Sequence, residues 1–181
     1  MTAPEYLQLR AFARVDGLKL FGLWLVSFIC YVQGLHSPGL GLVAMILALV
    51  TPFVSFNLLR KFRDEGLDGV ISFGRGWWYV VFQFFYASLL FAIAQFVYFT
   101  FIDKGTFINE MMELFSAPEM NETMRRMGMG DGIDQTLEMM RQMRPIDLVL
   151  NIMLSNLLVG CLLGVPIAAF AKRDKVEQSF K

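Results

Sequence analysis

The sequence is poor in the residues that build disulfide frameworks, metal centres and catalytic sites. Its 181 residues include two cysteines and one histidine. Cys30 and Cys161 lie within apolar runs, where a thiol behaves as a small hydrophobic group, so we expect no structural disulfide. His36 has no nucleophile, base or metal ligand at a recognisable spacing. The sequence therefore predicts no catalytic site, no cofactor and no metal site, and we expect the chain not to be an enzyme.

An excess of either charge sign is also lacking. Sixteen basic and sixteen acidic residues cancel to a net charge of zero. A global positive field for nucleic acid and a global negative field for cations are both absent, so we expect no nucleic-acid partner. The charges of this chain carry information through their location.

Long uncharged apolar runs are what the sequence does contain. Hydrophobic residues make up 56% of the chain and the mean hydropathy is +0.52, too apolar for an ordinary soluble domain. A helix needs about 20 apolar residues to cross the hydrocarbon of a bilayer. We therefore predict an all-α integral membrane four-helix bundle forming one domain over residues 1–181, with spans at about residues 18–35, 40–59, 77–102 and 148–171.

The basic residues near the span ends predict the orientation. Eleven Lys and Arg residues lie before the first span or at its inner edge, between the second and third spans, and after the fourth. The opposite side receives the short connection after residue 35 and the segment 103–147, which holds five basic against nine acidic residues. Cytoplasmic loops are enriched in Lys and Arg, so we expect both termini in the cytoplasm and Trp77, Trp78 and Tyr79 as interfacial anchors.

The fourth span carries small residues at four-residue spacing, at Asn156, Gly160, Gly164 and Ala168. Such a stripe lets a second backbone approach closely, so it predicts a helix-packing face. We expect this face to meet another helix of the same chain, with Gly22 as a candidate for the opposing surface. A partner's helix is the alternative.

The segment 103–147 predicts short amphipathic helices on the outer side of the membrane. We expect Thr106 to cap the first, the second to start near Pro118, and the third to follow Asp131 or Asp134. Nine of the twelve methionines fall in this segment. The residues predicted to form a partner or interface surface are Phe107, Met111, Met112, Phe115, Met124, Met127, Met140 and Met143.

The methionine spacing leaves a second interpretation open. Thioethers at Met124-x-x-Met127-x-Met129 and Met139-Met140-x-x-Met143 could bind a soft monovalent copper ion. The segment has no Cys or His to reinforce such a site. Methionine also suits an adaptable surface for protein or lipid.

The cytoplasmic connection between the second and third spans is basic at one end and rich in glycine at the other. Its Gly74-x-Gly76 is too little for a nucleotide fingerprint, because no parallel strand precedes it. We expect a tight re-entry turn whose basic residues touch anionic headgroups. The residues predicted to act here are Arg60, Lys61, Arg63, Arg75, Trp77 and Trp78.

Three short motifs carry a family resemblance. They are Lys61-Phe-Arg-Asp64, Gly69-Val-Ile-Ser-Phe-Gly74 and Tyr98-Phe-Thr-Phe-Ile-Asp103. With the four-span layout, they resemble the uncharacterised membrane family called domain of unknown function forty-one ninety-nine over residues 10–173. The sequence departs from it at Lys104-Gly105, where a proline is expected after the aspartate. The resemblance implies a Gram-negative inner-membrane protein and brings no catalytic residues. It also implies that relatives of this chain are encoded near a polyprenyl-phosphate glycosyltransferase.

Two functions remain open on these observations. The first is a non-enzymatic accessory, anchoring or scaffold subunit for a membrane-associated partner. The partner is another protein, with that glycosyltransferase as one candidate, or a second copy of the chain. The alternative is transport or flipping of a lipid-linked or small polar substrate. The amides of Gln83, Gln95, Asn151 and Asn156 would then line a polar track.

Overall fold

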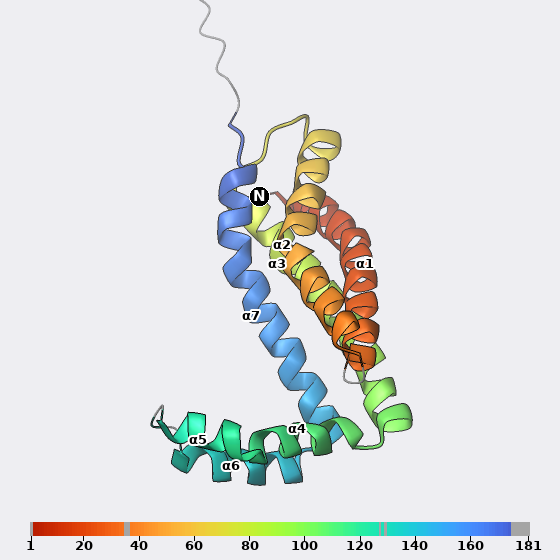
Figure 1. Ribbon diagram of the computed structural model, residues 1–181. Coiled ribbons are helices and arrows are strands. Elements are labelled where there is room, and N and C mark those ends of the chain that lie inside the picture. Colours follow the sequence, from red (N-terminus) through yellow and green to blue (C-terminus); the bar gives the residue numbers. More distant parts are fainter. Residues whose placement is uncertain (1, 35–36, 127, 129, 175–181) are drawn as a thin grey trace, which may run out of the picture. The chain divides into compact units, whose positions relative to one another are not determined.

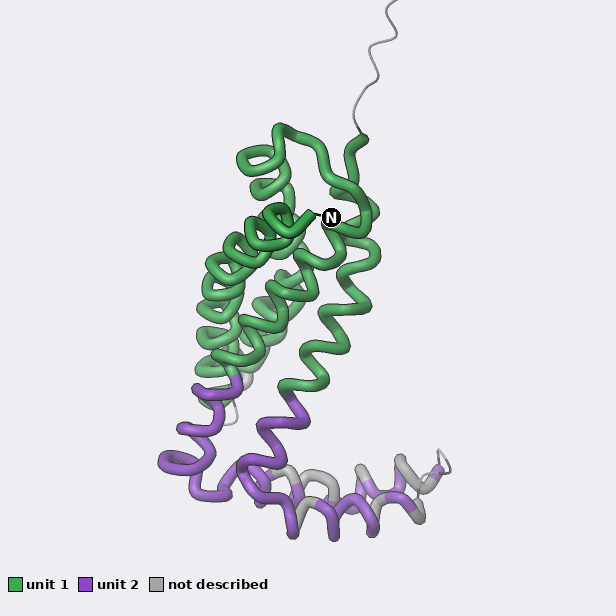
Figure 2. The backbone as a smooth tube through the Cα atoms, turned by 180° about the vertical axis from the view of Figure 1, so that it is seen from behind, with its two compact units in different colours: residues 1–91, 153–181 green, residues 92–152 purple. Residues whose placement is uncertain are grey.

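The computed structural model describes residues 2–34, 37–126, 128 and 130–174 (Figure 1). The chain divides into two compact units, residues 1–91 with 153–181, and residues 92–152 (Figure 2). Two long helices, α3 and α7, each contribute residues to both units. The units are described separately below.

The first unit is built from four long helices. They are α1 (Ala3–Gly34), α2 (Pro38–Gly66), most of α3 (Phe73–Val97) and the larger part of α7 (Pro145–Ala171). Four helical stretches are long and apolar enough to cross a membrane, namely Ala3–Gly34, Gly39–Gly66, Phe73–Asp103 and Pro145–Ala171. The structure thus confirms the predicted all-α membrane fold.

Helix α1 begins about fifteen residues before the predicted first span, at Ala3 instead of residue 18. Its first half buries Leu9 and Ala13, whose side chains are fully inaccessible. Close packing against α3 is possible because a Cβ placed on Gly17 would lie 2.8 Å from the Tyr86 Cβ. The predicted span covers the apolar second half of α1, because hydropathy defined it. Residues 3–17 extend the same helix before that span, with one side buried in the protein.

Helices α1 and α2 are antiparallel neighbours. Ser37 is the N-cap of α2 in an extended conformation, and its carbonyl accepts hydrogen bonds from the backbone N–H groups of Leu40 and Gly41. A Cβ on Gly34 would lie 2.7 Å from the Gly41 Cα, so the backbones approach closely where the pair turns. Glycine is required at Gly34 for this approach.

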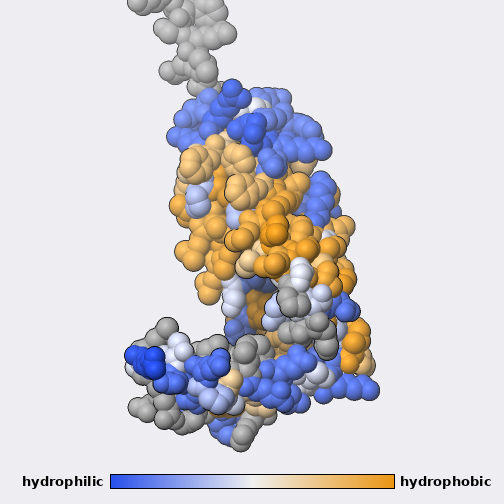
Figure 3. Space-filling model, viewed as in Figure 1, coloured by the Kyte–Doolittle hydropathy of each residue, from blue (hydrophilic) through white to orange (hydrophobic). Residues whose placement is uncertain are grey.

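The surface of the first unit shows a band of apolar side chains along its helices (Figure 3). Large exposed hydrophobic residues lie on α2 and α7, among them Leu49, Phe53, Leu162 and Phe170. Hydrophilic residues gather at the end that carries the α2–α3 loop. An apolar band bounded by polar residues matches the hydrocarbon of a bilayer and its headgroup layer.

The α2–α3 loop and the end of α7 are joined by backbone hydrogen bonds. The N–H of Ile71 donates to the Arg173 carbonyl at 3.0 Å, and the N–H of Arg173 donates back at 3.1 Å. The loop turns through Asp68 and Gly69, which have φ values of 52° and 79°. Positive φ is easily reached by glycine and tolerated by aspartate.

The second unit contains the end of α3, a π-helical turn η1 (Tyr98–Asp103), the start of α7 and three short helices. These are α4 (Thr106–Ser116), α5 (Pro118–Arg126) and α6 (Gly130–Gln142). Helix α6 begins before the two aspartates from which its start was predicted. Packing of α4 with α5 and α6 holds this segment together.

The predicted cap of α4 is wrong. Thr106 is the first helical residue, and its hydroxyl donates to the Asp103 carbonyl at 2.7 Å. The capping group is the Asp103 carboxylate, which accepts hydrogen bonds from the N–H groups of Gly105 and Phe107, each at 3.1 Å. A carboxylate at this position satisfies donors that the helix itself leaves free and complements its positive end.

Candidate functional site

A polar cluster, made of the contacts of Arg63, Arg75 and Gln8, joins the helices of the first unit at the end that carries the α2–α3 loop. Arg63 of α2 is 7% exposed, although the sequence placed it among the headgroup-facing residues. Its Nη1 donates to the carbonyl of Ala171 at the end of α7, at 2.9 Å, and its Nε pairs with Asp64 at 2.7 Å. The guanidinium thus caps α7, where a cation is favourable, instead of facing lipid.

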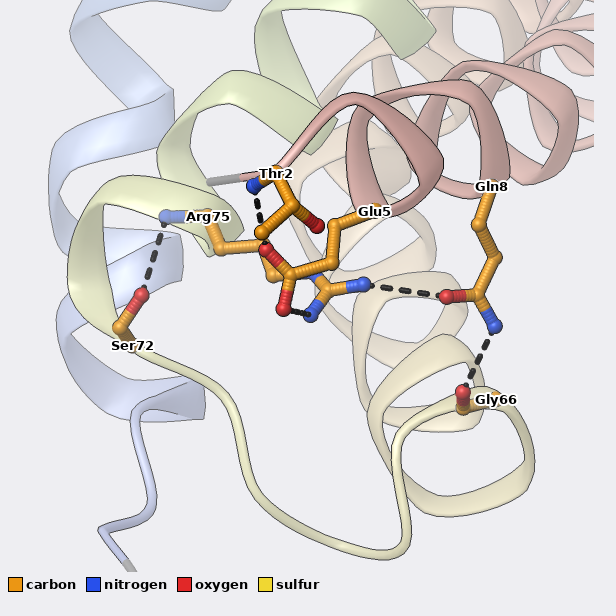
Figure 4. Close-up of polar contacts among 6 residues, drawn as sticks. All are labelled: Thr2, Glu5, Gln8, Gly66, Ser72 and Arg75. Carbon is orange, nitrogen blue, oxygen red and sulfur yellow. Dashed lines mark hydrogen bonds and ion pairs between the residues drawn. The ribbon is translucent and has the colours of Figure 1, made fainter.

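Arg75, near the start of α3, makes a second connection (Figure 4). Its Nη2 donates to the Gln8 Oε1 at 3.1 Å, and its Nη1 lies 3.5 Å from the Glu5 Oε1. Gln8 in turn donates through Nε2 to the Gly66 carbonyl at 2.9 Å. One chain of contacts therefore links α1, the end of α2 and the start of α3.

A polar cavity of about 900 Å³ lies beside this chain of contacts. Arg75, Glu5 and Gln8 line it together with Asp68 of the α2–α3 loop and Trp78 of α3. The Nε of Arg75 is buried and makes no hydrogen bond to any described residue. The cavity therefore holds a cation with spare donors, two carboxylates and an aromatic side chain.

An ionisable group that the sequence did not reveal is buried between α1 and α3. Asp16 is 5% exposed; it accepts a short hydrogen bond from the Tyr79 hydroxyl and another, at 2.6 Å, from Lys19. Tyr79 is fully buried, so its predicted role as an interfacial anchor is wrong. The spacing of Asp16 and Lys19 on one helix face was the available signal.

Gly160, Gly164 and Ala168 of the small-residue stripe of α7 lie against α3. A Cβ on Gly160 would sit 2.5 Å from the Phe84 Cβ, and one on Gly164 would sit 3.0 Å from the Trp77 Cδ1. A Cβ on Gly76 of α3 would lie 3.3 Å from the Cβ of Ala168. By contrast, a Cβ on Gly22 would meet nothing within 4 Å, so the prediction that Gly22 opposes the stripe is wrong.

An apolar groove of about 780 Å³ is open on the side of the first unit. All four long helices line it, with α2 contributing Ala48 and Leu49 and α7 contributing Asn156 and Val159. Trp24 donates through Nε1 to the Thr51 hydroxyl, and Ser27 donates to the Ala44 carbonyl. These polar groups on the wall are therefore already satisfied within the chain.

Asn156 differs from the other polar groups of the groove. Its side chain is half-buried and makes no hydrogen bond with the part of the chain that the structure describes. An amide at membrane depth without a partner is unfavourable, because hydrocarbon offers neither donors nor acceptors. Asn156 thus differs from Ser27 and Thr51 of the same wall, because its hydrogen-bonding groups are not used within the described chain.

The four amides considered for a polar track differ in burial and in the unit to which they belong. Gln83 is fully buried, and its Oε1 accepts a hydrogen bond from Ser55 of α2 at 2.7 Å. Gln95 is also buried, whereas Asn151 is exposed, and both belong to the second unit. Of the four, Asn156 lines the groove.

The predicted outer surface is described in part. Phe107 and Met112 of α4 are half-buried, as is Met143. The ring of Phe107 packs against that of Phe99 in a tilted arrangement, with a centroid distance of 5.4 Å. The remaining side chains lie outside the described residues: Met111, Phe115, Met124, Met127 and Met140. Their role as a partner surface stays a prediction.

Four residues of the predicted cytoplasmic set differ in exposure. Arg60 and Lys61 are exposed; the Arg60 guanidinium lies over the Phe56 ring, and Lys61 pairs with Glu65 at 3.8 Å. Trp78 is 46% exposed and suits an interfacial anchor. Trp77 instead donates through Nε1 to the Cys161 carbonyl of α7, at 3.0 Å.

The fold and these contacts define a helical membrane protein. A family model matches residues 16–173, and the chain belongs to that family, described as Protein of unknown function (DUF4199). The match covers all four candidate membrane helices in whole or in large part. No curated protein and no solved structure matches the chain significantly.

Proposed function

We propose that this protein is a non-enzymatic accessory or scaffold subunit of the bacterial inner membrane, with both termini in the cytoplasm, and that its apolar groove receives a transmembrane helix of a partner protein. The observation that carries the proposal is Asn156, an amide without a partner on the wall of that groove.

The chemistry of the groove favours a helix over a lipid chain as its occupant. A lipid chain fills apolar volume but offers no hydrogen-bonding group at the depth of an amide in mid-helix. A partner helix with a polar side chain supplies that group, and such bonds are worth about 1 kcal/mol or more in membranes. A groove lined by four helices also offers continuous van der Waals contact, which drives helix association in lipid.

The orientation is supported by where the basic residues lie. Arg63, Arg75 and Arg173 each take part in hydrogen bonds at the end of the first unit where the α2–α3 loop, the start of α1 and the end of α7 are joined. Clustered basic residues at one end of a membrane bundle are typical of its cytoplasmic side.

Site-specific photo-crosslinking in cells tests the proposal. A photoreactive amino acid replaces Asn156 in the groove or, as a control, Leu154, which is 56% exposed on the same helix and outside the groove. We expect a discrete protein adduct from position 156 alone, with the crosslinked peptide in a predicted transmembrane helix. The membrane-associated glycosyltransferase and a second copy of this chain are the first adducts to test for.

Filling the groove supplies the matched variant. Ala48 lines the groove and is exposed, so Ala48→Trp occupies its volume without displacing a buried neighbour. Ile46→Trp adds the same bulk outside the groove, at a residue that is 56% exposed. The adduct should disappear with Ala48→Trp and persist with Ile46→Trp. Adducts formed with lipid alone would overturn the proposal and favour passage of a lipid-linked substrate.

A further inference from the structure

The polar cavity beside Arg75 has the charge pattern of a site for a zwitterion. Arg75 contributes the cation, and Glu5 and Asp68 contribute two carboxylates. A ligand with one charge would meet repulsion from part of this wall, whereas a ligand with a separated anion and cation can meet both kinds of group. The volume, about 900 Å³, lies within the range of about 300–1,000 Å³ common for small-molecule sites.

The cationic side of the cavity is not saturated by the protein. The Arg75 side chain is 15% exposed, yet of its three nitrogens two have partners, and the contact with Glu5 is long at 3.5 Å. A guanidinium has five N–H donors, so a buried one with unused donors is suited to a phosphate.

The start of α3 adds further donors on the same side. Gly74 lines the cavity, and its N–H makes no hydrogen bond within the described chain. Arg75's own N–H is capped by the Ser72 hydroxyl at 3.4 Å. The positive end of this 25-residue helix therefore reinforces Arg75 as the place for an anion.

The opposite charge is provided by carboxylates that remain accessible. The Glu5 side chain is 42% exposed and Asp68 is exposed. Each carboxylate can accept hydrogen bonds from an ammonium group, which has three N–H donors. A trimethylated ammonium has no N–H donor, so the Glu5 and Asp68 carboxylates should distinguish a primary amine from a quaternary one.

The position of the cavity points to a lipid instead of a soluble molecule. Trp78 is 46% exposed on its wall, and tryptophan concentrates at the headgroup layer of a membrane. The cavity is lined by the α2–α3 loop and the start of α3, and α3 continues from there as an apolar helix. From this arrangement we infer that the cavity binds the phosphoethanolamine headgroup of an aminophospholipid, with the phosphate on Arg75 and the start of α3, and the ammonium on Glu5 and Asp68.

Native mass spectrometry of the full chain in mild detergent tests this inference. Phosphatidylethanolamine, phosphatidylcholine and phosphatidylglycerol with identical acyl chains are titrated separately, and glycerophosphoethanolamine serves as the soluble probe. We expect phosphatidylethanolamine to bind about tenfold more tightly than the other two lipids, the size of effect that one or two charge-assisted hydrogen bonds produce. The soluble probe should bind much more weakly than the lipid.

Three variants separate the two halves of the site. Arg75→Gln should weaken binding of all three lipids, because all carry the phosphate. Asp68→Asn should reduce the preference for phosphatidylethanolamine over phosphatidylcholine while retaining the phosphate contact. Asparagine tolerates the positive φ of 52° at this position, so the loop is preserved. Arg126→Gln, a charge change at an exposed residue that does not line the cavity, should leave the three affinities unchanged.

Several outcomes would overturn the inference. Equal affinity for the three lipids would exclude headgroup recognition, and stronger binding of phosphatidylglycerol would show an anion site without a role for the carboxylates. Equal affinity for the soluble probe would exclude a lipid as the ligand. If Arg75→Gln does not fold, an unchanged preference for phosphatidylethanolamine in Asp68→Asn is sufficient to reject the inference.

Discussion

The contact between α7 and α3 makes a quantitative prediction for Gly160→Ala. The added Cβ would lie 2.5 Å from both Cβ and Cγ of Phe84, about 1 Å inside the usual contact distance between carbon atoms. Phe84 is 1% exposed and cannot move away freely. Overpacking of this kind costs about 1–3 kcal/mol, whereas the change from glycine to alanine within a helix returns about 0.5–1 kcal/mol.

Gly22→Ala is the matched control, because a Cβ there meets nothing within 4 Å. The gain from helix propensity is common to both variants, so the difference between them isolates the steric term. For a chain of this size, about 1–3 kcal/mol corresponds to roughly 2–12 °C in Tm. Gly164→Ala, whose Cβ would lie 3.0 Å from the Trp77 Cδ1, should fall between the two.

Thermal unfolding of the purified protein in one detergent measures this series, with loss of a monodisperse elution peak as the readout. The expected order of Tm is Gly22→Ala highest, then Gly164→Ala, then Gly160→Ala. Equal values for Gly160→Ala and Gly22→Ala would refute close packing of α7 on α3 at this point.

Two further predictions concern the polar contacts. Arg63→Met should lower the free energy of unfolding by about 1.5–3 kcal/mol, because the last carbonyl of α7 loses a charged donor. The control Lys61→Met, at an exposed position, should change the free energy of unfolding by less than about 0.5 kcal/mol. Thermal unfolding in detergent measures both variants. Asp103→Ala should cost about 0.5–2 kcal/mol locally by removing the cap of α4, seen as faster hydrogen exchange at the N–H of Phe107 with unchanged exchange in α1.

The sequence allowed prediction of those features that depend on neighbouring residues. Uncharged runs about as long as the bilayer is thick predicted the four long helices, and Pro118 predicted the start of α5. The boundaries were less accurate where packing decides them. Residues 3–17 of α1 carry charges and lower the hydropathy, yet they are helical because one face is buried.

The polar clusters could not be predicted because their partners are distant in sequence. Arg63 binds a carbonyl 108 residues away, and Asp16 meets a hydroxyl 63 residues away. Hydropathy and charge placement assign both residues to a solvated interface, since nothing local distinguishes an arginine that faces headgroups from one that caps a distant helix. The contacts beside the cavity are of the same kind, because Arg75 meets Glu5 and Gln8, and Gln8 meets Gly66, across 58 to 70 residues of sequence.

Helix α7 is joined to the rest of the first unit from Gly160, which packs on Phe84, to its last residue, Ala171. At the last turn the Ala171 carbonyl accepts a hydrogen bond from Arg63, and Arg173 exchanges two backbone hydrogen bonds with Ile71. Asn156 lies four residues before Gly160, about 6 Å along the helix axis at 1.5 Å per residue. The close glycine contact therefore fixes the helix next to this amide, so a partner helix would meet a groove wall whose position is already set before binding.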